Sequence, residues 1–139
     1  MKKNLFCLLF ITLISACGGT KYSNSSNSLG VTKTETLIND AVKIKKRLGS
    51  VFSSADDENQ YNLIFGELKS RHPEWDWERI DNSRVEKGMT EKEVLLAWGF
   101  PDSKSKSVSW KYFRVDKSKA IVNFEDSRVN KVIVINSFN

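Results

Sequence analysis

The chain has few of the residues that build redox, metal and hydrolytic centres. Its 139 residues include two cysteines, Cys7 and Cys17, and one histidine, His72. Both cysteines lie in the first 17 residues, so the rest of the chain has no thiols for a disulfide or a thiolate metal site. A lone histidine lacks the second imidazole or thiol that a zinc site requires. The sequence therefore predicts a domain held together by packing, without a metal centre.

Motifs of the common enzyme classes are also missing. No serine lies in a Gly-x-Ser-x-Gly elbow, and His72 would have to act as the base for any of them. The glycines form no phosphate-binding loop. The acidic run at residues 56–58 is explained by helix capping, because a general acid and a general base need two different environments across a cleft. We therefore expect neither an enzyme nor a bound cofactor.

The first residues have the pattern of an export signal. Lys2 and Lys3 are followed by an apolar run and then by small residues, which is typical of a secretory signal in residues 1–16. Residues 14–17, Ile-Ser-Ala-Cys, match the lipobox of bacterial lipoproteins. This resemblance implies acylation of Cys17, with palmitate as the expected lipid. Because residue 18 is glycine rather than aspartate, it also implies an outer-membrane anchor facing the periplasm. An ordinary signal peptide or a short membrane anchor is the alternative.

The charge balance does not indicate nucleic-acid binding. Loss of residues 1–16 removes two lysines and leaves 20 basic and 17 acidic residues. This mild excess is far from the strongly basic surface of nucleic-acid-binding proteins. Residues 17–33 begin with the expected lipid site and continue as a small, polar, aperiodic stretch, which predicts a flexible tether.

Helical periodicity covers residues 34–72. Segment 34–48 repeats apolar residues at helical spacing and has a basic cluster near its end, which predicts an amphipathic helix. That cluster would suit either acidic lipid head groups or plain exposure to solvent. A second helix is expected over residues 58–70 and a short one around residues 75–80, with Pro73 between them. The first two helices could form a hairpin or extend the core of the domain that follows.

Residues 88–102 read as a short helix with marked ends. Thr90 and Glu93 form a capping box at its start, and Gly99 and Pro101 end it. A helix of this length is unstable alone, so its apolar side must pack on another element. The residues expected to be buried are Met89, Val94, Leu95 and Trp98. The structural motif as a whole comprises Gly88, Met89, Thr90, Glu93, Trp98, Gly99 and Pro101.

The pattern changes from helical to alternating after Pro101. Three β-rich runs, residues 107–115, 120–124 and 130–135, are separated by short polar turns, which predicts a three-stranded antiparallel meander. With turns at residues 117–118 and 126–127, one face would be the core face. It would hold Phe113, Val115, Ala120, Val122, Phe124, Val129, Ile133 and Ile135. The opposite face would hold Trp110, Tyr112, Arg114, Ile121, Asn123, Val132 and Val134.

The second of these faces is the candidate partner-binding surface. Aromatic and arginine side chains are enriched at protein interfaces. A face covered by the helices of residues 34–70 would have a similar composition, so the pattern leaves both possibilities. The candidate contact residues are Trp110, Tyr112, Arg114, Ile121 and Asn123.

The order of these elements resembles the SmpA/OmlA family of outer-membrane lipoproteins, the BamE-like domain. The resemblance covers roughly residues 74–135. It implies an α+β domain over residues 73–139, with short helices on one face of a three-stranded antiparallel sheet, preceded by a helical extension over residues 34–72. Ser127 departs from the glycine that the family commonly has there. The matching residues are Gly88, Met89, Thr90, Val94, Gly99, Pro101, Trp110, Tyr112, Phe124, Asp126 and Val129.

Two functions are compatible with this resemblance. It implies a scaffold that supports the β-barrel assembly machinery or envelope integrity through protein contacts. The alternative is a free-standing binding or inhibitor module on the same fold, as in β-lactamase-inhibitor-like domains, with a different envelope partner. Neither function requires a cofactor, a metal or nucleic acid.

Overall fold

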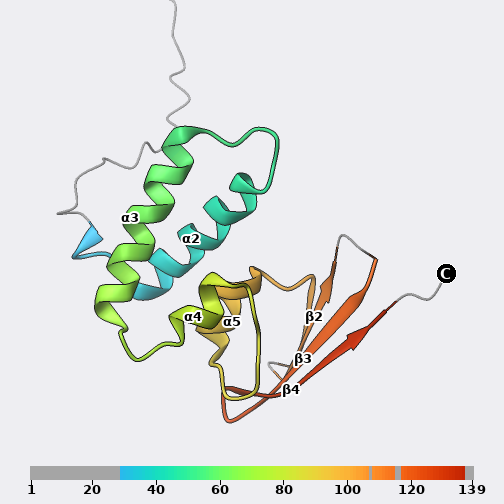
Figure 1. Ribbon diagram of the computed structural model, residues 1–139. Helices are drawn as coiled ribbons and strands as arrows, with labels where there is room; N and C mark the ends of the chain where they lie inside the picture. Colours follow the sequence, from blue (N-terminus) through green and yellow to red (C-terminus); the bar gives the residue numbers. More distant parts are fainter. Residues whose placement is uncertain (1–28, 107, 115–116, 137–139) are drawn as a thin grey trace, which may run out of the picture.

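The computed structural model describes residues 29–106, 108–114 and 117–136, which form an α+β fold. The helices lie together on one side of an antiparallel sheet with strand order β1-β2-β3-β4 (Figure 1). The proposed signal peptide, Cys17 and the first part of the tether lie outside the described residues. The elements are α2 (Thr34–Leu48), α3 (Ala55–Arg71), α4 (Trp77–Asp81), α5 (Glu91–Trp98), β1 (Ser103–Ser105), β2 (Ser109–Phe113), β3 (Lys119–Glu125) and β4 (Arg128–Ile135).

The helix ends follow local capping chemistry. Helix α2 has the predicted bounds, and α5 begins with the predicted capping box of Thr90 and Glu93. Helix α3 begins earlier than expected, because the Ser54 side chain accepts from the Asp57 N–H and the Asp57 carboxylate accepts from the Ser54 N–H. Gly99 ends α5 with φ at 85°, a region that residues with a side chain rarely adopt. The termini of the helices were therefore largely encoded within a few residues of each end.

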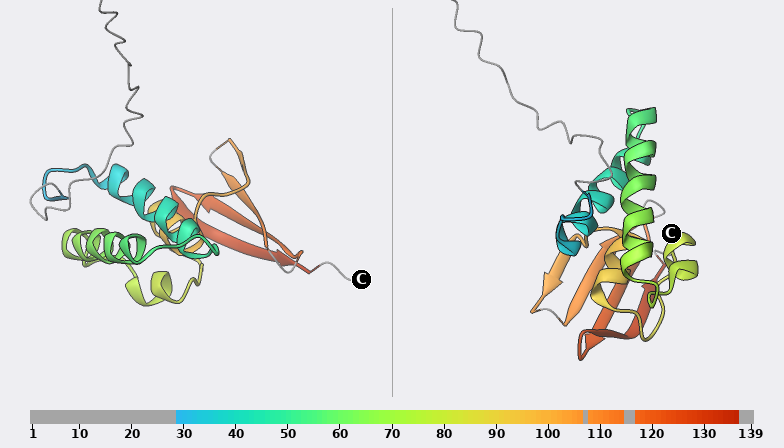
Figure 2. Two further views of the ribbon diagram at one scale, coloured as in Figure 1. Left: turned by 90° about the horizontal axis from the view of Figure 1, so that it is seen from above. Right: turned by 90° about the vertical axis from the view of Figure 1, so that its left-hand side faces the viewer.

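Helices α2 and α3 both form a hairpin and extend the core of the sheet domain. They pack side by side, and α2 also contacts α5, as the views in Figure 2 show. A single cluster of buried side chains joins the hairpin to the sheet. It includes Leu37, Ala41 and Ile44 of α2, Ile64 and Leu68 of α3, Val94 and Leu96 of α5, and Val122 and Val129 of the sheet.

Helix α5 buries a somewhat different side from the one predicted. Met89 and Val94 are buried as expected, whereas Leu95 and Trp98 are only partly buried. Leu96 and Ala97 lie in the core instead. The reason is that α5 is contacted by α2 and α4 as well as by the sheet, so its buried surface is wider than one stripe.

The sheet has four strands rather than the predicted three. The additional strand, β1, pairs antiparallel with β2, placing Ser103 opposite Lys111. Its sequence, Ser-Lys-Ser, has none of the β-branched or aromatic residues that indicate a strand. Asp102 holds this hairpin closed: its N–H donates to the Lys111 carbonyl at 2.9 Å, and its carboxylate accepts from the Phe113 N–H at 2.6 Å. Backbone pairing, not composition, therefore defines β1.

The predicted register between β2 and β3 was wrong. Residues 114–118 lie between the paired residues Phe113 and Lys119, so the connection is longer than a two-residue turn at 117–118. Consequently Trp110 opposes Val122 and Tyr112 opposes Ala120. Trp110 and Tyr112 therefore lie on the face covered by helices, and Phe113 lies on the uncovered face. Val115 falls outside the described residues.

The turn between β3 and β4 was predicted correctly, but the strand beyond it was not. Asp126 and Ser127 form the turn with φ at 51° and 60°, and Phe124 opposes Val129 as expected. A β-bulge then shifts the register, because Asn123 pairs with Lys131 and leaves Asn130 unmatched. The shift turns the later residues of β4 over: Val132 and Val134 share the side of Val122 and Ala120, while Ile133 and Ile135 lie on the uncovered side.

Candidate functional site

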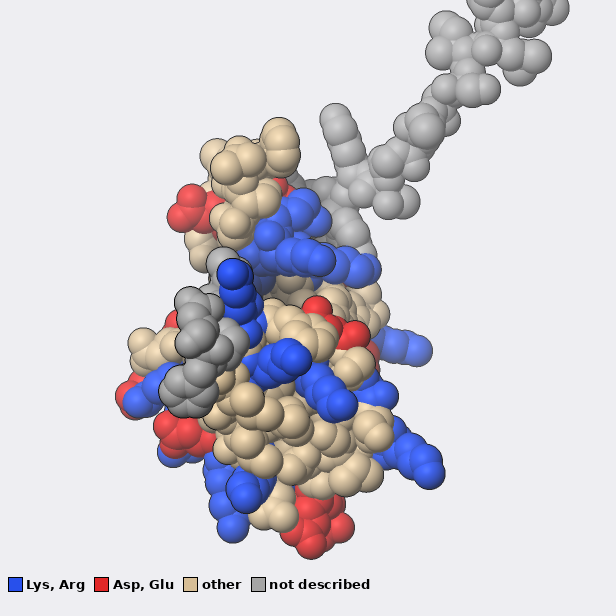
Figure 3. All heavy atoms as spheres, turned by 90° about the vertical axis from the view of Figure 1, so that its right-hand side faces the viewer, with Lys and Arg blue, Asp and Glu red and all other residues tan. Residues whose placement is uncertain are grey.

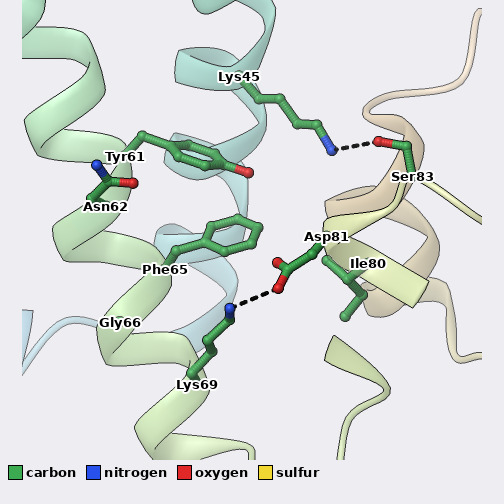
Figure 4. A pocket seen from close by; sticks show the side chains of 9 residues that line it. All are labelled: Lys45, Tyr61, Asn62, Phe65, Gly66, Lys69, Ile80, Asp81 and Ser83. Carbon is green, nitrogen blue, oxygen red and sulfur yellow. Dashed lines mark hydrogen bonds and ion pairs between the residues drawn. The ribbon is translucent and has the colours of Figure 1, made fainter. Parts of the chain in front are cut away.

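A first hollow, about 390 Å³ in volume, lies between α2, α3 and α4 (Figure 4). Its polar groups are matched to one another. The Lys69 ammonium lies 2.9 Å from the Asp81 carboxylate, and the Lys45 side chain extends to the Ser83 hydroxyl at 3.4 Å. Burial raises the pKa of Tyr61 in its wall to about 12, which keeps the phenol protonated. These contacts join α2, α3 and the end of α4 around the hollow.

A second hollow of about 480 Å³ lies where the ends of α2 and α5 meet β2. Here too the polar groups are used internally. The Tyr112 hydroxyl donates to the Gly99 carbonyl at 3.2 Å, and the Trp98 ring N–H donates to the Ser83 carbonyl at 2.8 Å. Burial, with a smaller effect of the Asp102 charge, raises the pKa of Tyr112. These contacts join α5 and its C-cap residue Gly99 to β2 and to the loop after α4.

Lys45 lines both hollows and acts as a clamp between α2 and α5. Its ammonium donates to the carbonyl oxygens of Leu96 and Ala97 at 2.9 and 2.8 Å. These carbonyls belong to the last turn of α5, where a helix lacks internal donors. Burial lowers the pKa of Lys45, opposed by the negative charge of Asp81. We assign Lys45 a structural role, because its hydrogens point at backbone acceptors.

A third hollow, about 370 Å³, lies beside the start of α5. Glu93 in its wall is buried, and its carboxylate accepts three hydrogen bonds at 2.7 to 2.9 Å: from the Asp76 N–H, the Thr90 N–H and the Thr90 hydroxyl. A carboxylate bonded in this way is positioned to hold the loop before α5 against the helix. Glu93 therefore extends the predicted capping box by one long-range contact.

The lone histidine is part of an aromatic stack. Its ring lies 4.1 Å from that of Trp75, and Nδ1 lies 2.9 Å from the Glu74 carboxylate. The other ring nitrogen lies 3.3 Å from the Thr34 hydroxyl. Within residues 29–106, 108–114 and 117–136, no three His, Cys, Asp or Glu side chains are grouped as metal ligands would be. His72 thus tethers the end of α3 to the start of α2.

The uncovered face of the sheet is the most distinctive surface of the described chain. We call it the open sheet face and define it by three cross-strand rows. The rows are Phe113, Lys119 and Ile135; Ser103, Lys111, Ile121 and Ile133; and Ser105, Ser109, Asn123 and Lys131. Phe113 is 60% exposed and Ile135 47%, while Ile121 and Ile133 are half-buried by their neighbours. It combines apolar and basic side chains.

Basic charge dominates the open sheet face. Lys111, Lys119 and Lys131 are exposed and form no ion pair with a carboxylate among the described residues, as is also true of Lys46 and Lys87 elsewhere. What distinguishes the face is that its three lysines lie close together among apolar residues. Lys119 lies 5.6 Å from the centre of the Phe113 ring. Figure 3 views the molecule from the side on which the sheet lies and shows Lys and Arg side chains spread over it with uncharged surface between them.

The structure places the predicted contact residues in three different surroundings. Trp110 and Tyr112 are only 1% and 6% exposed, so their placement on an open surface was wrong. Arg114 is exposed and lies over the Trp98 ring at 5.5 Å, beside the second hollow. Ile121 and Asn123 do lie on the open sheet face. The residues that were missed there include Phe113, Lys111, Lys119, Lys131, Ile133 and Ile135; the alternation of β2 could have revealed Phe113 if the turn length had been known.

The loop between α2 and α3 presents a second exposed apolar spot. Val51 and Phe52 are 92% and 88% exposed at its tip. Basic residues at the end of α2 and acidic residues at the start of α3 lie on either side of this tip. The Arg47 guanidinium of α2 lies 2.7 Å from the Asp57 carboxylate of α3. The tip therefore has no charge preference comparable with that of the open sheet face.

Comparison with known proteins adds no relative to this picture: no protein-family model, no curated protein and no solved structure matches the chain. Among the described residues, no helix combines the length and the apolar character needed to cross a membrane. The assignment of function therefore depends on the motifs and on the surfaces described above.

Proposed function

We propose that the protein is a lipid-anchored envelope scaffold of the BamE-like type, which holds a partner protein through the open sheet face. The observation that carries this proposal is the asymmetry of the sheet. Helices bury Trp110, Tyr112 and Val122 on one face, although Val134 at its end is 49% exposed. The other face exposes Phe113 and Ile135 among lysines that have no ion-pair partner among the described residues. Isolated exposed apolar residues are common, but a group of them on one flat surface marks an interaction site.

The positions of the motif residues support the family part of the proposal. Thr90 and Glu93 cap α5, Gly99 has positive φ, and Met89, Trp110 and Phe124 are buried between helix and sheet. For Thr90, Glu93, Gly99 and Met89 these are the structural roles that the resemblance implies, whereas Trp110 was expected on the open face. The three hollows described above suggest no competing function, because most of the polar groups described in them bond to each other or to the backbone.

One feature favours the alternative, a binding or inhibitor module with a dedicated partner. The hairpin of α2 and α3 shares a continuous core with the sheet domain, and the family pattern has no counterpart for it. A domain enlarged in this way has additional surface for a different partner. The scaffold function predicts a subunit of the barrel-assembly machinery at the open sheet face, and the module function predicts one unrelated envelope protein there.

Site-specific photocrosslinking in intact cells tests the proposal. A photoreactive phenylalanine analogue replaces Phe113 or Ile121 on the open sheet face, or Leu63, which is 47% exposed on α3, as the control. We expect crosslinks to barrel-assembly subunits from the first two positions and not from Leu63. Crosslinks to one unrelated envelope protein would favour the module, and no crosslink from either face position would refute the proposed surface.

The anchor is tested separately. Metabolic labelling with an alkyne fatty acid should label the full-length protein, and membrane fractionation should recover it with the outer membrane. Cys17→Ala should abolish both the labelling and the recovery in that fraction. Unchanged labelling of the Cys17→Ala variant would refute the lipoprotein part of the proposal, whatever the outcome at the open sheet face.

A further inference from the structure

The charge pattern of the open sheet face specifies its partner further. Building on the proposed function, we infer that this face is a docking surface for an amphipathic helix of a partner protein that presents Asp or Glu side chains beside an apolar stripe. The inference depends on three features of the face: its unpaired lysines, the position of its apolar residues, and its flat geometry.

The lysines of the open sheet face have no carboxylate partner among the described residues and are free to pair with carboxylates of another protein. Lys111, Lys119 and Lys131 lie on three different strands, and the neighbouring positions in their rows are serine, asparagine or apolar residues. Neither aspartate nor glutamate occurs in any of the three rows. Glu125, the next residue of β3 on this side, lies opposite Arg128 at the edge of the face. A partner that supplies carboxylates would therefore meet a surface with an excess of lysines, and opposite charges across an interface favour association.

The apolar residues lie between the lysines, not apart from them. Ile121 and Ile133 oppose each other in the central row, and Ile135 lies in the next row on the same strand as Ile133. Lys111 adjoins Ile121 in the central row, and Lys119 separates Phe113 from Ile135 in its own row. A partner must consequently contact apolar residues and lysines that lie next to each other on the same face of the sheet.

A helix fits these requirements better than the other possible occupants. A sheet face offers only side chains, and in two-layer folds it is covered by helices or by another sheet. A second copy of this chain would bring lysines against lysines. A membrane takes apolar side chains below the level of the basic ones, whereas here both lie in the same rows and two of the isoleucines are half-buried.

The spacing of the lysines also suits a helix. With strands about 4.8 Å apart and alternate residues about 6.8 Å apart, the Cα atoms of Lys111 and Lys119 are roughly 8 Å apart. Lys131 is then roughly 12 to 14 Å from both. Residues four and seven positions apart on a helix are separated by about 6 and 10.5 Å along its axis. Lysine and glutamate side chains are long and flexible enough to bridge the differences between these two sets of distances.

Zero-length crosslinking tests the chemistry of this contact. Carbodiimide treatment of cells that express the tagged full-length protein joins lysine amines to carboxylates in direct contact. After recovery of the tagged protein, we expect Lys111, Lys119 or Lys131 to be linked to Asp or Glu residues of a helical segment of the protein captured by the photoreactive group at Ile121. Links only to carboxylates in strands or loops, or no links from these three lysines, would overturn the inference.

Charge reversal provides the matched control. The variant Lys111→Glu, Lys119→Glu and Lys131→Glu should lower the photocrosslink yield at Ile121 at least about tenfold, since like charges at an interface are strongly unfavourable. The variant Lys33→Glu, Lys46→Glu and Lys87→Glu changes exposed lysines elsewhere by the same net charge and should leave the yield within about twofold. Thermal melts by circular dichroism confirm that both variants fold.

The outcomes separate this inference from the proposed function. If photocrosslinks form but the two charge-reversed variants give equal yields, the acidic helix is excluded while the scaffold proposal stands. If Phe113 and Ile121 give no photocrosslink, the proposed function fails first. If the wild-type protein binds vesicles of phosphatidylcholine with phosphatidylglycerol, only the open-face reversal abolishes this, and no carboxylate links are found, then the face contacts lipid and the inference is overturned.

Discussion

The side chain of Lys45 in α2 donates a 2.8 Å hydrogen bond to the carbonyl oxygen of Ala97 in the last turn of α5. Lys45→Met keeps most of the apolar stem and removes the donor, leaving two terminal carbonyls of α5 without this partner. We expect a loss of about 1–3 kcal/mol in the free energy of unfolding, measured with urea. Lys46→Met, at the exposed neighbouring position, is the control and should change it by less than about 0.5 kcal/mol. Equal effects would contradict the clamp.

The buried carboxylate of Glu93 should be the most sensitive part of the α5 start. Glu93→Ala leaves the Asp76 and Thr90 N–H groups without their acceptor. The expected loss is about 2 kcal/mol or more. Glu91→Ala removes an acidic residue from the same first turn, for which the structure records no side-chain hydrogen bond, and should cost under about 1 kcal/mol. Chemical unfolding of the two variants at pH 7 measures the difference.

Two glycines should respond to alanine in opposite directions. Gly66 lies inside α3, and a Cβ there would meet no atom within 4 Å, so Gly66→Ala should stabilise the protein by about 0.5–1 kcal/mol. Gly99 has φ at 85°, so Gly99→Ala should destabilise it by roughly 1–2 kcal/mol. Thermal melts of the two variants would refute the assigned backbone conformations if both shifted the same way.

The two aromatic residues of β2 should differ sharply in their effect on stability. Trp110→Ala empties a fully buried site and should cost about 3–5 kcal/mol. Phe113→Ala, on the open sheet face, should cost less than about 1 kcal/mol. Trp110→Phe should be milder than Trp110→Ala, because the buried indole N–H has no hydrogen-bond partner in the described structure and its removal offsets part of the lost packing. A larger loss from Phe113→Ala than from Trp110→Ala would reverse the face assignment.

Acid stability should depend on Asp57. Hydrogen bonds from Arg47 and then from Ser54 lower the pKa of this carboxyl. Asp57 therefore binds a proton more readily in the unfolded state than in the folded state. Its contribution to stability is fully present above its usual pKa and is lost as the pH falls through the folded-state pKa. Asp57→Asn should flatten the decline in stability below about pH 4. Asp56→Asn, at the exposed neighbouring position, should leave the decline as it is; identical slopes in both variants would contradict this role.

The local elements could be read from the sequence because their signals are local. Thr90 and Glu93 are three residues apart, and Gly99 and Pro101 follow within one turn, so the bounds of α5 did not depend on distant contacts. The helical spacing of Leu37, Ala41 and Ile44 likewise identified the buried side of α2. The contact between the Glu93 carboxylate and Asp76 could not be predicted in this way, because it joins residues across a loop.

The faces of the sheet could not be read in the same way. Strand β2 has large apolar residues at both parities, Trp110 and Tyr112 on one and Phe113 on the other, so hydrophobicity alone does not decide which side is buried. The length of the turn decides it, and the bulge opposite Asn123 reverses the choice again in β4. The candidate surface was consequently correct only in part: Ile121 and Asn123 do lie on the open sheet face, whereas Trp110 and Tyr112, which were predicted to lie there too, are buried.

The hydrogen bonds of Lys45 join parts of the chain that are far apart in the sequence, which affects how the protein folds. The carbonyls that Lys45 binds follow 51 and 52 residues later in the sequence, so a ribosome releases the α2–α3 hairpin well before α5 exists. Until then Val42 and Ile44 of α2 lack the sheet domain with which they share a core. Non-local contacts of this kind slow folding and prolong the exposure of apolar surface. Growth of the polypeptide from its N-terminus therefore produces an unfinished hairpin first, and a chaperone that shields apolar segments would have its longest task on residues 34–71.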